Sequence, residues 1–330
     1  MLGGKSLVAK IVGAPIYLSR ELIRPHICRA RQSRSGHLLV VEVNSWVGLF
    51  AHLETFLEIS LHCERYNLTP CFMSTSSQYV DPQRGPNWFE YFFTNLQLSV
   101  EDSEKIKNGQ VPICRIEGIR QLGLPEDYDP QLDLRIAPQL VRKYIGIKSH
   151  ILEKVDTFVT TYFKNRSVLG IHYRGTDKRS SPISYSDFRK SIDNFLLKNP
   201  VFDCLFVSSD EQSFVDFIKN EFRHTLPVFY HDDHERSKTK IAIHRSKSGD
   251  GFRKAEEAVL NCLLLSRCGA LMKTASFLSG WSKLFNPDLL VILLNRPFER
   301  ELWFPDRELL FENQITFSGD VLNESLSLNR

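Results

Sequence analysis

Residues 167–178 read SVLGIHYRGTDK, a short apolar run followed directly by polar and charged residues. An apolar run of this length with polar flanks predicts a buried strand. From there on, apolar runs alternate with segments of helical spacing, the runs at 203–208, 226–230, 270–273 and 289–293 and the helices at 185–197, 211–222, 252–268 and 277–285. This alternation predicts βαβ units, and therefore a parallel sheet with helices on both faces.

The N-terminal half shows a weaker version of the same rhythm. Strands are predicted at 37–43, 70–73 and 111–116, with a helix over 46–66 and a polar loop over 74–86. A long helix predicted over 139–163 is interpreted as a bridge between two domains. We therefore expect an α/β protein with two Rossmann-like domains facing a cleft, over residues 1–150 and 151–330.

The composition narrows the class of protein. Hydrophobic residues make up 42% and charged residues 25% of the 330, the balance of a soluble globular protein. A net charge of +3 is too small to indicate a nucleic-acid partner, and no apolar run reaches the ~18 residues of a membrane span. Residues 1–17 lack the long apolar core and cleavage site of an export signal. The seven cysteines form no CxxC pair, so we expect reduced thiols in a cytoplasmic protein.

Candidate site residues follow the predicted strand ends, because ligands of an open parallel sheet bind beyond its carboxyl edge. The richest end presents His172, Arg174, Gly175, Thr176, Asp177 and Lys178. Arg174 offers a planar fork of donors for phosphate oxygens, and Lys178 adds a second, compact charge. Thr176 supplies a hydroxyl, Gly175 lets the backbone approach a ligand, and Asp177 is expected to anchor one of the cations. The pattern predicts a diphosphate site, with a solvated turn and a structural ion pair as the alternative.

Three other connections between strands and helices add candidates. The carboxylate of Asp210 either accepts a hydrogen bond from a nucleotide ring or ribose hydroxyl, or caps the next helix. Thr274, Ser276 and Phe277 lie between a strand and a helix, where free backbone N–H groups suit an anion unless Ser276 only caps that helix. Arg253, at another helix start, is expected to reach the same diphosphate.

Three sequence blocks in this order resemble those of the GDP-fucose-dependent fucosyltransferases, which include α1,6-fucosyltransferases, rhizobial nodulation fucosyltransferases and protein O-fucosyltransferases. The blocks are HYRGTDK at 172–178, SSDE at 208–211, and the stretch 257–287 with LLLSRC, TASFLS and Asn-Pro. The resemblance covers residues 165–297 and implies a GT-B fold, GDP-fucose held by the second domain, and neither a metal nor another cofactor. It maps the arginine that contacts the donor diphosphate onto Arg174, the acid of that motif onto Asp177, and a serine of the third block onto Ser276.

The chain also departs from the family pattern. The α1,6 enzymes have a second arginine where Gly175 stands, and an acid shortly after the motif where residues 179–182 read RSSP. The glycine-rich N-terminal turn of the family is reduced to NSWVGL at 44–49. The general base and the acceptor therefore stay open. His52 and Glu54, at the start of the first predicted helix, are candidates for the base, or else ordinary residues of a helix surface.

The resulting prediction is transfer of fucose from GDP-fucose to a hydroxyl of a glycan or glycoconjugate, with inversion and without a metal. Arg174, Lys178 and backbone donors near Ser276 would stabilise the charge that develops on the departing GDP. Three alternatives stay open. In the first, the donor is another nucleotide sugar. In the second, the chain is a glycan- or nucleotide-binding protein with a degenerate catalytic site. In the third, Asp127 and Asp129 hold a divalent cation for a metal-dependent transferase.

Overall fold

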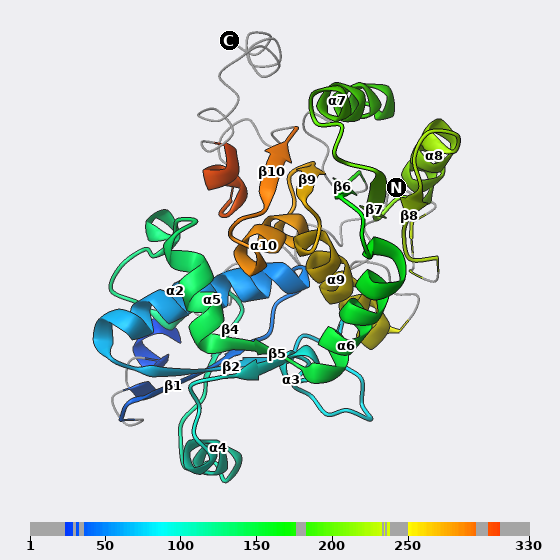
Figure 1. Ribbon diagram of the computed structural model, residues 1–330. Coiled ribbons are helices and arrows are strands. Elements are labelled where there is room, and N and C mark those ends of the chain that lie inside the picture. The colour runs from blue at the N-terminus through cyan, green and yellow to red at the C-terminus, as the bar shows by residue number, and fades with distance from the viewer. Residues whose placement is uncertain are drawn as a thin grey trace, which may run out of the picture.

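Two parallel sheets carry the fold (Figure 1), in a computed structural model that describes residues 24–28, 31–32, 36–175, 183–232, 234, 236–237, 250–294 and 303–310. The smaller sheet has the strand order β2-β1-β4, with β1 (Leu38–Val43), β2 (Thr69–Ser74) and β4 (Cys114–Ile116). The larger sheet has the order β10-β9-β6-β7-β8, with β6 (Val168–Tyr173), β7 (Cys204–Ser209), β8 (Val228–Phe229), β9 (Ala270–Lys273) and β10 (Leu290–Leu293). These sheets confirm the predicted α/β class.

Helices connect the strands in both halves of the chain. The N-terminal half contains α2 (Leu49–Tyr66), α3 (Phe89–Phe92), α4 (Val100–Lys107) and α5 (Ile136–Tyr144), with 3₁₀ turns at Ile119–Leu122 and Asp129–Gln131. α6 (Ser149–Phe158) leads into the C-terminal half, which contains α7 (Tyr185–Lys198), α8 (Gln212–Phe222), α9 (Gly251–Ser266) and α10 (Phe277–Phe285). Helix α10 has the bounds predicted from the sequence, whereas α4 was not predicted, because its residues are mostly polar.

The larger sheet is covered by helices on both faces, as its continuous apolar strands require. Ile171 and Val207 point to one face and pack with Phe214 of α8 in one apolar cluster. Phe206 points to the other face and belongs to a second cluster, together with Leu264 of α9. The alternation follows from the two-residue period of a strand, so the core positions are set by the apolar runs themselves.

The prediction of one long helix over 139–163 is wrong. After α5 the chain forms strand β5 (Ile145–Ile147), which pairs antiparallel with β3 (Phe93–Asn95), and α6 then ends in a π-helical turn at Val159–Phe163. An Ile-Gly-Ile sequence weakens a helix, because β-branched residues lose rotamer freedom in it and glycine has no side chain to limit the unfolded chain. Gly146 also permits close packing, since a Cβ there would lie 2.7 Å from the side chain of Leu96.

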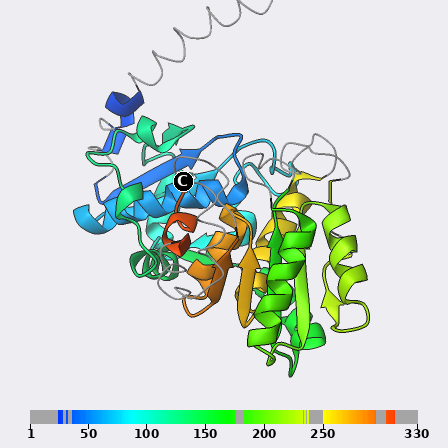
Figure 2. The same cartoon turned by 90° about the horizontal axis from the view of Figure 1, so that it is seen from above.

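The two halves meet through α9 and α10, which lie between the sheets (Figures 1 and 2). Helix α10 packs on α2 and α5, and α9 packs on α6. Trp281 of α10 is fully buried, with its ring centroid 6.1 Å from that of Phe50 in α2. One apolar cluster therefore runs from the N-terminal half into α9 and α10. The domain boundary near residue 150 stays a prediction.

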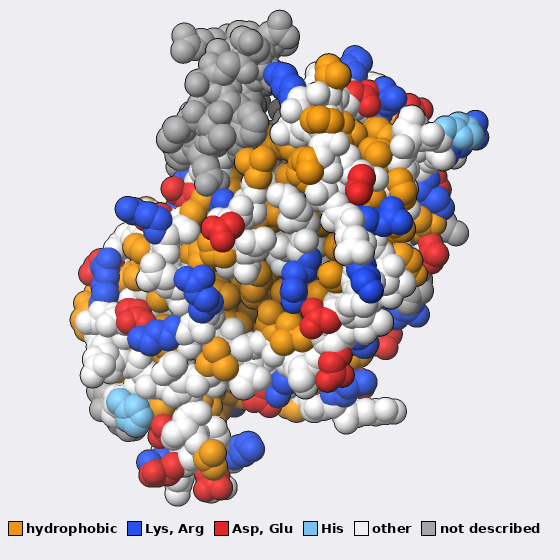
Figure 3. Space-filling view, viewed as in Figure 1, with side chains coloured by type: hydrophobic (Ala, Val, Ile, Leu, Met, Phe, Trp, Pro, Cys, Tyr) orange, Lys and Arg blue, Asp and Glu red, His pale blue; other side chains and the backbone are white. Residues whose placement is uncertain are grey.

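The charge of the surface and the apolar character of the helices concern two kinds of partner, nucleic acids and membranes. On the face shown in Figure 3, acidic and basic side chains are interspersed and no large area carries one sign of charge. Within the described ranges, no helix combines the length and the apolar character that crossing a bilayer would require.

Candidate functional site

Arg174 stands at the carboxyl edge of the larger sheet, directly after β6, in a position held by its neighbours. Its Nε lies 3.2 Å from Oδ2 of Asp210, which follows β7, and its backbone N–H donates to Oγ1 of Thr274 after β9 (2.7 Å). The other carboxylate oxygen of Asp210 accepts from the N–H of Gly175 (3.2 Å). Residues at three strand ends therefore hold Arg174 in place, its guanidinium through Asp210 and its backbone through Thr274. Asp210 was predicted as a nucleotide ligand or a helix cap, but here it orients Arg174.

Gly175 is placed where a larger residue would collide. A Cβ at this position would lie 2.5 Å from the carboxylate of Glu211, which is itself held by the hydroxyl of Tyr185 (2.6 Å). Gly175 was predicted to let the backbone approach a ligand. Within the described residues, the group that its backbone approaches is the carboxylate of Glu211. Thr176, Asp177 and Lys178 lie outside the described residues.

The Arg174 side chain lies near the N-terminal half. Burial raises the pKa of Tyr79 to about 12, and the charge of Arg174 acts in the opposite direction, which places the guanidinium within electrostatic reach of the loop after β2. The same loop touches α9, since a Cβ on Gly251 would lie 2.5 Å from the carbonyl oxygen of Gln78. The carboxyl edge of the larger sheet, the N-terminus of α9 and the loop after β2 therefore converge at one junction.

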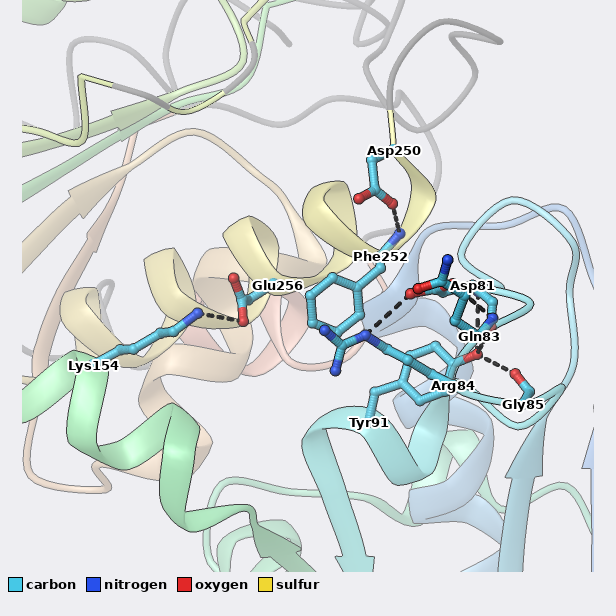
Figure 4. Close-up of polar contacts among 9 residues, drawn as sticks. All are labelled: Asp81, Gln83, Arg84, Gly85, Tyr91, Lys154, Asp250, Phe252 and Glu256. Atoms are coloured by element: carbon cyan, nitrogen blue, oxygen red, sulfur yellow. Dashed lines mark hydrogen bonds and ion pairs between the residues drawn. The ribbon is translucent and has the colours of Figure 1, made fainter.

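Aromatic and ionic contacts lock this junction (Figure 4). The guanidinium of Arg84 lies 3.9 Å from the ring centroid of Phe252, in the first turn of α9, and its Nε lies 3.1 Å from Oδ2 of Asp81. Phe252 also stacks on Phe92 at a centroid distance of 5.3 Å. A cation held over a ring in this way contributes about 0.5–1 kcal/mol or more. The contacts keep the loop after β2 in place beside α9.

The start of α10 differs from the prediction of an open anion site. The N–H of Ser276 donates to Oδ2 of Asp306 (2.7 Å), and the ammonium group of Lys273 pairs with the other oxygen of that carboxylate. Asp306 belongs to the segment 303–310, so an internal carboxylate already satisfies this N–H group. The Ser276 side chain makes no capping bond, and Phe277 stacks on Trp303 of the same segment at 5.4 Å.

His172 is buried and Arg253 is exposed, and the contact of each with a diphosphate stays a prediction. His172 is 3% exposed, and burial lowers its pKa well below the ordinary value, with Lys273 and Arg174 adding to the effect. The imidazole is therefore neutral and lies beneath the sheet edge. Arg253 has its Nε 3.0 Å from Oε1 of Glu257, one turn further along α9, and its charge acts on His234. No contact between Arg253 and Arg174 is found in the described structure.

Neither candidate for the general base lies on a helix surface. His52 is fully buried, and burial lowers its pKa to about 4. One ring nitrogen lies 3.1 Å from the carbonyl oxygen of Ser45, and the other lies 3.2 Å from Oγ of Ser74. With both nitrogens engaged inside the core, His52 acts as an anchor for the β1–α2 loop and is no longer proposed as the base.

Glu54 is also buried, on the side of α2 that faces α10. Burial raises its pKa well above the ordinary value, and the charges of Asp129 and Glu58 add to this. The indole N–H of Trp281 lies close enough to lower that pKa without completing a hydrogen bond. A protonated carboxyl group packed between helices does not fit the role of a base, so Glu54 is no longer proposed as the base.

Glu58, one turn after Glu54, gives a testable pH dependence. Glu58 is 7% exposed, and burial, with the charges of Asp129 and Asp127, raises its pKa to about 8 from 4.5. The folded state then binds a proton that the unfolded state has lost, so this contribution to stability is full below pH 4.5 and disappears as the pH rises to about 8.

We expect Glu58→Gln to remove the loss of stability between pH 4.5 and about 8, because an amide does not ionise. The free energy of unfolding of the variant, minus that of the parent protein, should grow as the pH rises from about 5 to about 8. Urea unfolding at a series of pH values measures the difference. Glu101→Gln, at a strongly exposed glutamate of α4, is the control. Parallel curves for Glu58→Gln and the parent protein would contradict the assignment.

The fold and the site define an α/β protein in which one oriented guanidinium stands where parallel strand ends meet a second sheet-bearing half. No family model matches the chain, and no curated protein matches it. Among solved structures, NodZ α1,6-fucosyltransferase soaked with GDP-fucose aligns with a TM-score of 0.52 and 16% identity, over 76% of this chain and 93% of that chain.

Two further alignments are weaker. A mutant of FUT1 from Arabidopsis thaliana in complex with GDP gives a TM-score of 0.48 and 13% identity, over 85% of this chain and 76% of that one. POFUT1 in complex with GDP-fucose gives 0.47 and 9%, over 79% and 98%. The likeness to NodZ shows that the two chains share a fold, and at that level it confirms the resemblance drawn from the sequence blocks.

Proposed function

We propose that this protein is a fucosyltransferase of the GT-B type, which moves fucose from GDP-fucose to a hydroxyl of a glycan or glycoconjugate. The observation that carries the proposal is the placement of Arg174, oriented by Asp210 at the carboxyl edge of the larger sheet and within electrostatic reach of Tyr79 in the N-terminal half. NodZ, which shares the fold, has been crystallised and soaked with GDP-fucose. The C-terminal half would hold the donor, and the N-terminal half would receive the acceptor.

The proposed reaction is a direct displacement with inversion. The acceptor oxygen forms a bond to the anomeric carbon of fucose and releases its proton to solvent, while the bond from that carbon to the phosphate oxygen breaks and GDP leaves with the electron pair. Arg174 faces the negative charge that develops on the diphosphate, and Lys178 is proposed as a second cation. A preorganised charge in a water-poor site needs no reorganisation at the moment of reaction.

Protein cations take the place of a metal in this proposal. The alternative that uses Asp127 and Asp129 loses support, because Oδ2 of Asp129 lies 2.8 Å from the guanidinium of Arg307. Asp129 also belongs to the acidic surroundings of Glu54 and Glu58 on α2, a different part of the molecule from Arg174. A cytoplasmic location is part of the proposal, since all seven cysteines are free and buried.

Thermal unfolding with GDP-fucose, GDP-mannose and UDP-glucose, each with and without EDTA, tests donor and metal together. A ligand at 100 times its Kd stabilises the native state by about 2.7 kcal/mol. We expect GDP-fucose to raise the melting temperature, GDP-mannose to raise it less, the UDP-sugar to leave it unchanged, and EDTA to have no effect. If only UDP-glucose stabilises the protein, the donor is a UDP-sugar and not GDP-fucose. Binding of GDP-fucose with neither hydrolysis nor transfer would favour the degenerate binding protein.

A further inference from the structure

We propose that Trp46 is a stacking platform for a sugar ring of the acceptor, so that the acceptor is an oligosaccharide or a glycoconjugate rather than a small alcohol. This inference rests on the proposed function, because it assigns the acceptor side of the same junction. It begins from an indole exposed on the connection between β1 and α2.

Trp46 is the most exposed aromatic side chain in the described part of the chain, at 65%. Two of the other tryptophans, Trp88 and Trp281, are fully buried, and Trp303 is partly covered by its stacking on Phe277. An exposed indole loses the stabilisation that burial of so large an apolar side chain provides. Its neighbour Val47 is also exposed, so the apolar surface continues along the loop.

The loop that carries Trp46 is pinned on both sides of it. Before Trp46, the ring of His52 lies 3.1 Å from the carbonyl oxygen of Ser45. After it, the side-chain amide of Gln78 donates to the carbonyl of Val47, and the N–H of Leu49 donates to the hydroxyl of Tyr79 (3.2 Å).

Two of these anchors are buried polar side chains. His52 is kept neutral in the core while it holds the loop, and Tyr79 lies in the core beside Trp88. A rigid aromatic group binds a ligand at a lower entropic cost than a mobile one, because little freedom is left to lose. The exposure of Trp46 is thus a property of a fixed loop.

The loop lies at the junction with the C-terminal half. It follows the carboxyl end of β1, and the connection from β1 to α2 lies at the end of the first sheet nearest α9 (Figure 1). Gln78 and Tyr79, which hold the loop, are the residues that approach Gly251 of α9 and the charge of Arg174. The loop that carries Trp46 therefore borders the junction that also contains the guanidinium proposed to face the donor diphosphate.

The chemistry of the platform favours a sugar over a second charged group. An indole presents a flat, neutral and polarisable face, and the C–H groups on one side of a pyranose ring form a matching apolar face. The nucleotide is expected at the carboxyl edge of the larger sheet, where the Arg174 loop lies. A ring on the opposite side of the junction therefore meets the acceptor rather than the guanine base.

Transfer kinetics test the role of Trp46. With GDP-fucose as donor, Trp46→Ala should raise the KM for the oligosaccharide acceptor about tenfold or more, the loss expected for one well-packed aromatic contact. In Trp46→Phe, the KM for the acceptor should return most of the way to the parental value. The KM for GDP-fucose should stay unchanged in both variants. Tyr66→Ala, at an exposed aromatic residue at the other end of α2, is the matched control. An acceptor KM that does not change in Trp46→Ala overturns the proposal.

A binding experiment without donor separates this inference from the proposed function. Tetrasaccharides of N-acetylglucosamine, glucose and mannose are titrated while tryptophan fluorescence is followed. At least one should change the emission of the parent protein and of Trp303→Phe, but not that of Trp46→Phe. If none does, the platform is wrong, even where GDP-fucose binds. If a sugar binds through Trp46 but GDP-fucose does not, the fucosyltransferase is wrong and the platform stands. A parallel fall in GDP affinity in Trp46→Ala would assign the ring to the base and overturn the proposal.

Discussion

Arg174→Ala lowers the rate of fucosyl transfer by about 10²–10³-fold, the effect expected when one preorganised donor to a developing anion is removed. Arg174 is held at the carboxyl edge of the larger sheet by residues after two neighbouring strands, its guanidinium by Asp210 and its backbone N–H by Thr274. An alanine leaves the leaving diphosphate without that charge, and water does not replace a donor held in a fixed direction. Transfer to a glycan acceptor at saturating GDP-fucose measures the effect.

Two comparisons separate the charge from the geometry. Arg174→Lys keeps the charge but not the planar fork, so it should recover only part of the rate. Arg115→Ala is the matched control, because Arg115 also pairs through Nε with a carboxylate, Oε2 of Glu42 at 2.9 Å, but on the smaller sheet. It should transfer fucose at the parental rate. Parental activity in correctly folded Arg174→Ala would remove the diphosphate role and with it the proposed mechanism.

Asp306→Ala destabilises the fold by about 3–5 kcal/mol, because it leaves a buried ammonium group without its counter-charge. Lys273 is 0% exposed and pairs with Asp306, which also accepts from the N–H of Ser276. Burial lowers the pKa of Lys273, and the nearby carboxylate of Asp306 opposes that shift. Without the carboxylate, Lys273 must lose its proton or admit water, and either outcome weakens the contact between α10 and the segment 303–310.

Urea unfolding compares Asp306→Ala with a surface pair. Glu101→Ala removes the partner of Lys105 on the exposed face of α4, and should cost about 0–1 kcal/mol. The double variant Lys273→Met with Asp306→Leu should recover most of the stability lost in the single variant, since apolar residues of similar volume often replace a buried pair without loss. Equal losses in Asp306→Ala and Glu101→Ala would show that the buried pair does not support the fold.

Periodicity alone predicted most of the C-terminal half. A strand buried on both faces and a helix with one apolar stripe each leave a local pattern, and β9 and α10 have the predicted bounds. The position of Arg174 at a strand end also follows from local sequence, because the polar residues begin where the apolar run of β6 stops.

Prediction from local sequence patterns failed where contacts between distant segments determine the structure. The helix predicted over 139–163 spans Ile145 and Ile147, which suit a buried strand as well as a helix, and pairing with β3 selected the strand. His52 and Glu54 are polar residues in an apolar helix. Only the tertiary structure shows that His52 is buried against Ser74 and Trp88, and that Glu54 is buried beside Trp281 of α10.

The sequence by itself determined the α/β class, the order of most strands and helices, and the end of β6 as the place of a cationic site, because each depends on residues adjacent along the chain. Tertiary structure alone decided that Asp210 orients Arg174, that Asp306 fills the start of α10, and that Trp46 stays exposed on a pinned loop. Each of these depends on groups tens of residues apart, whose distance is set by how the two sheets and their helices pack.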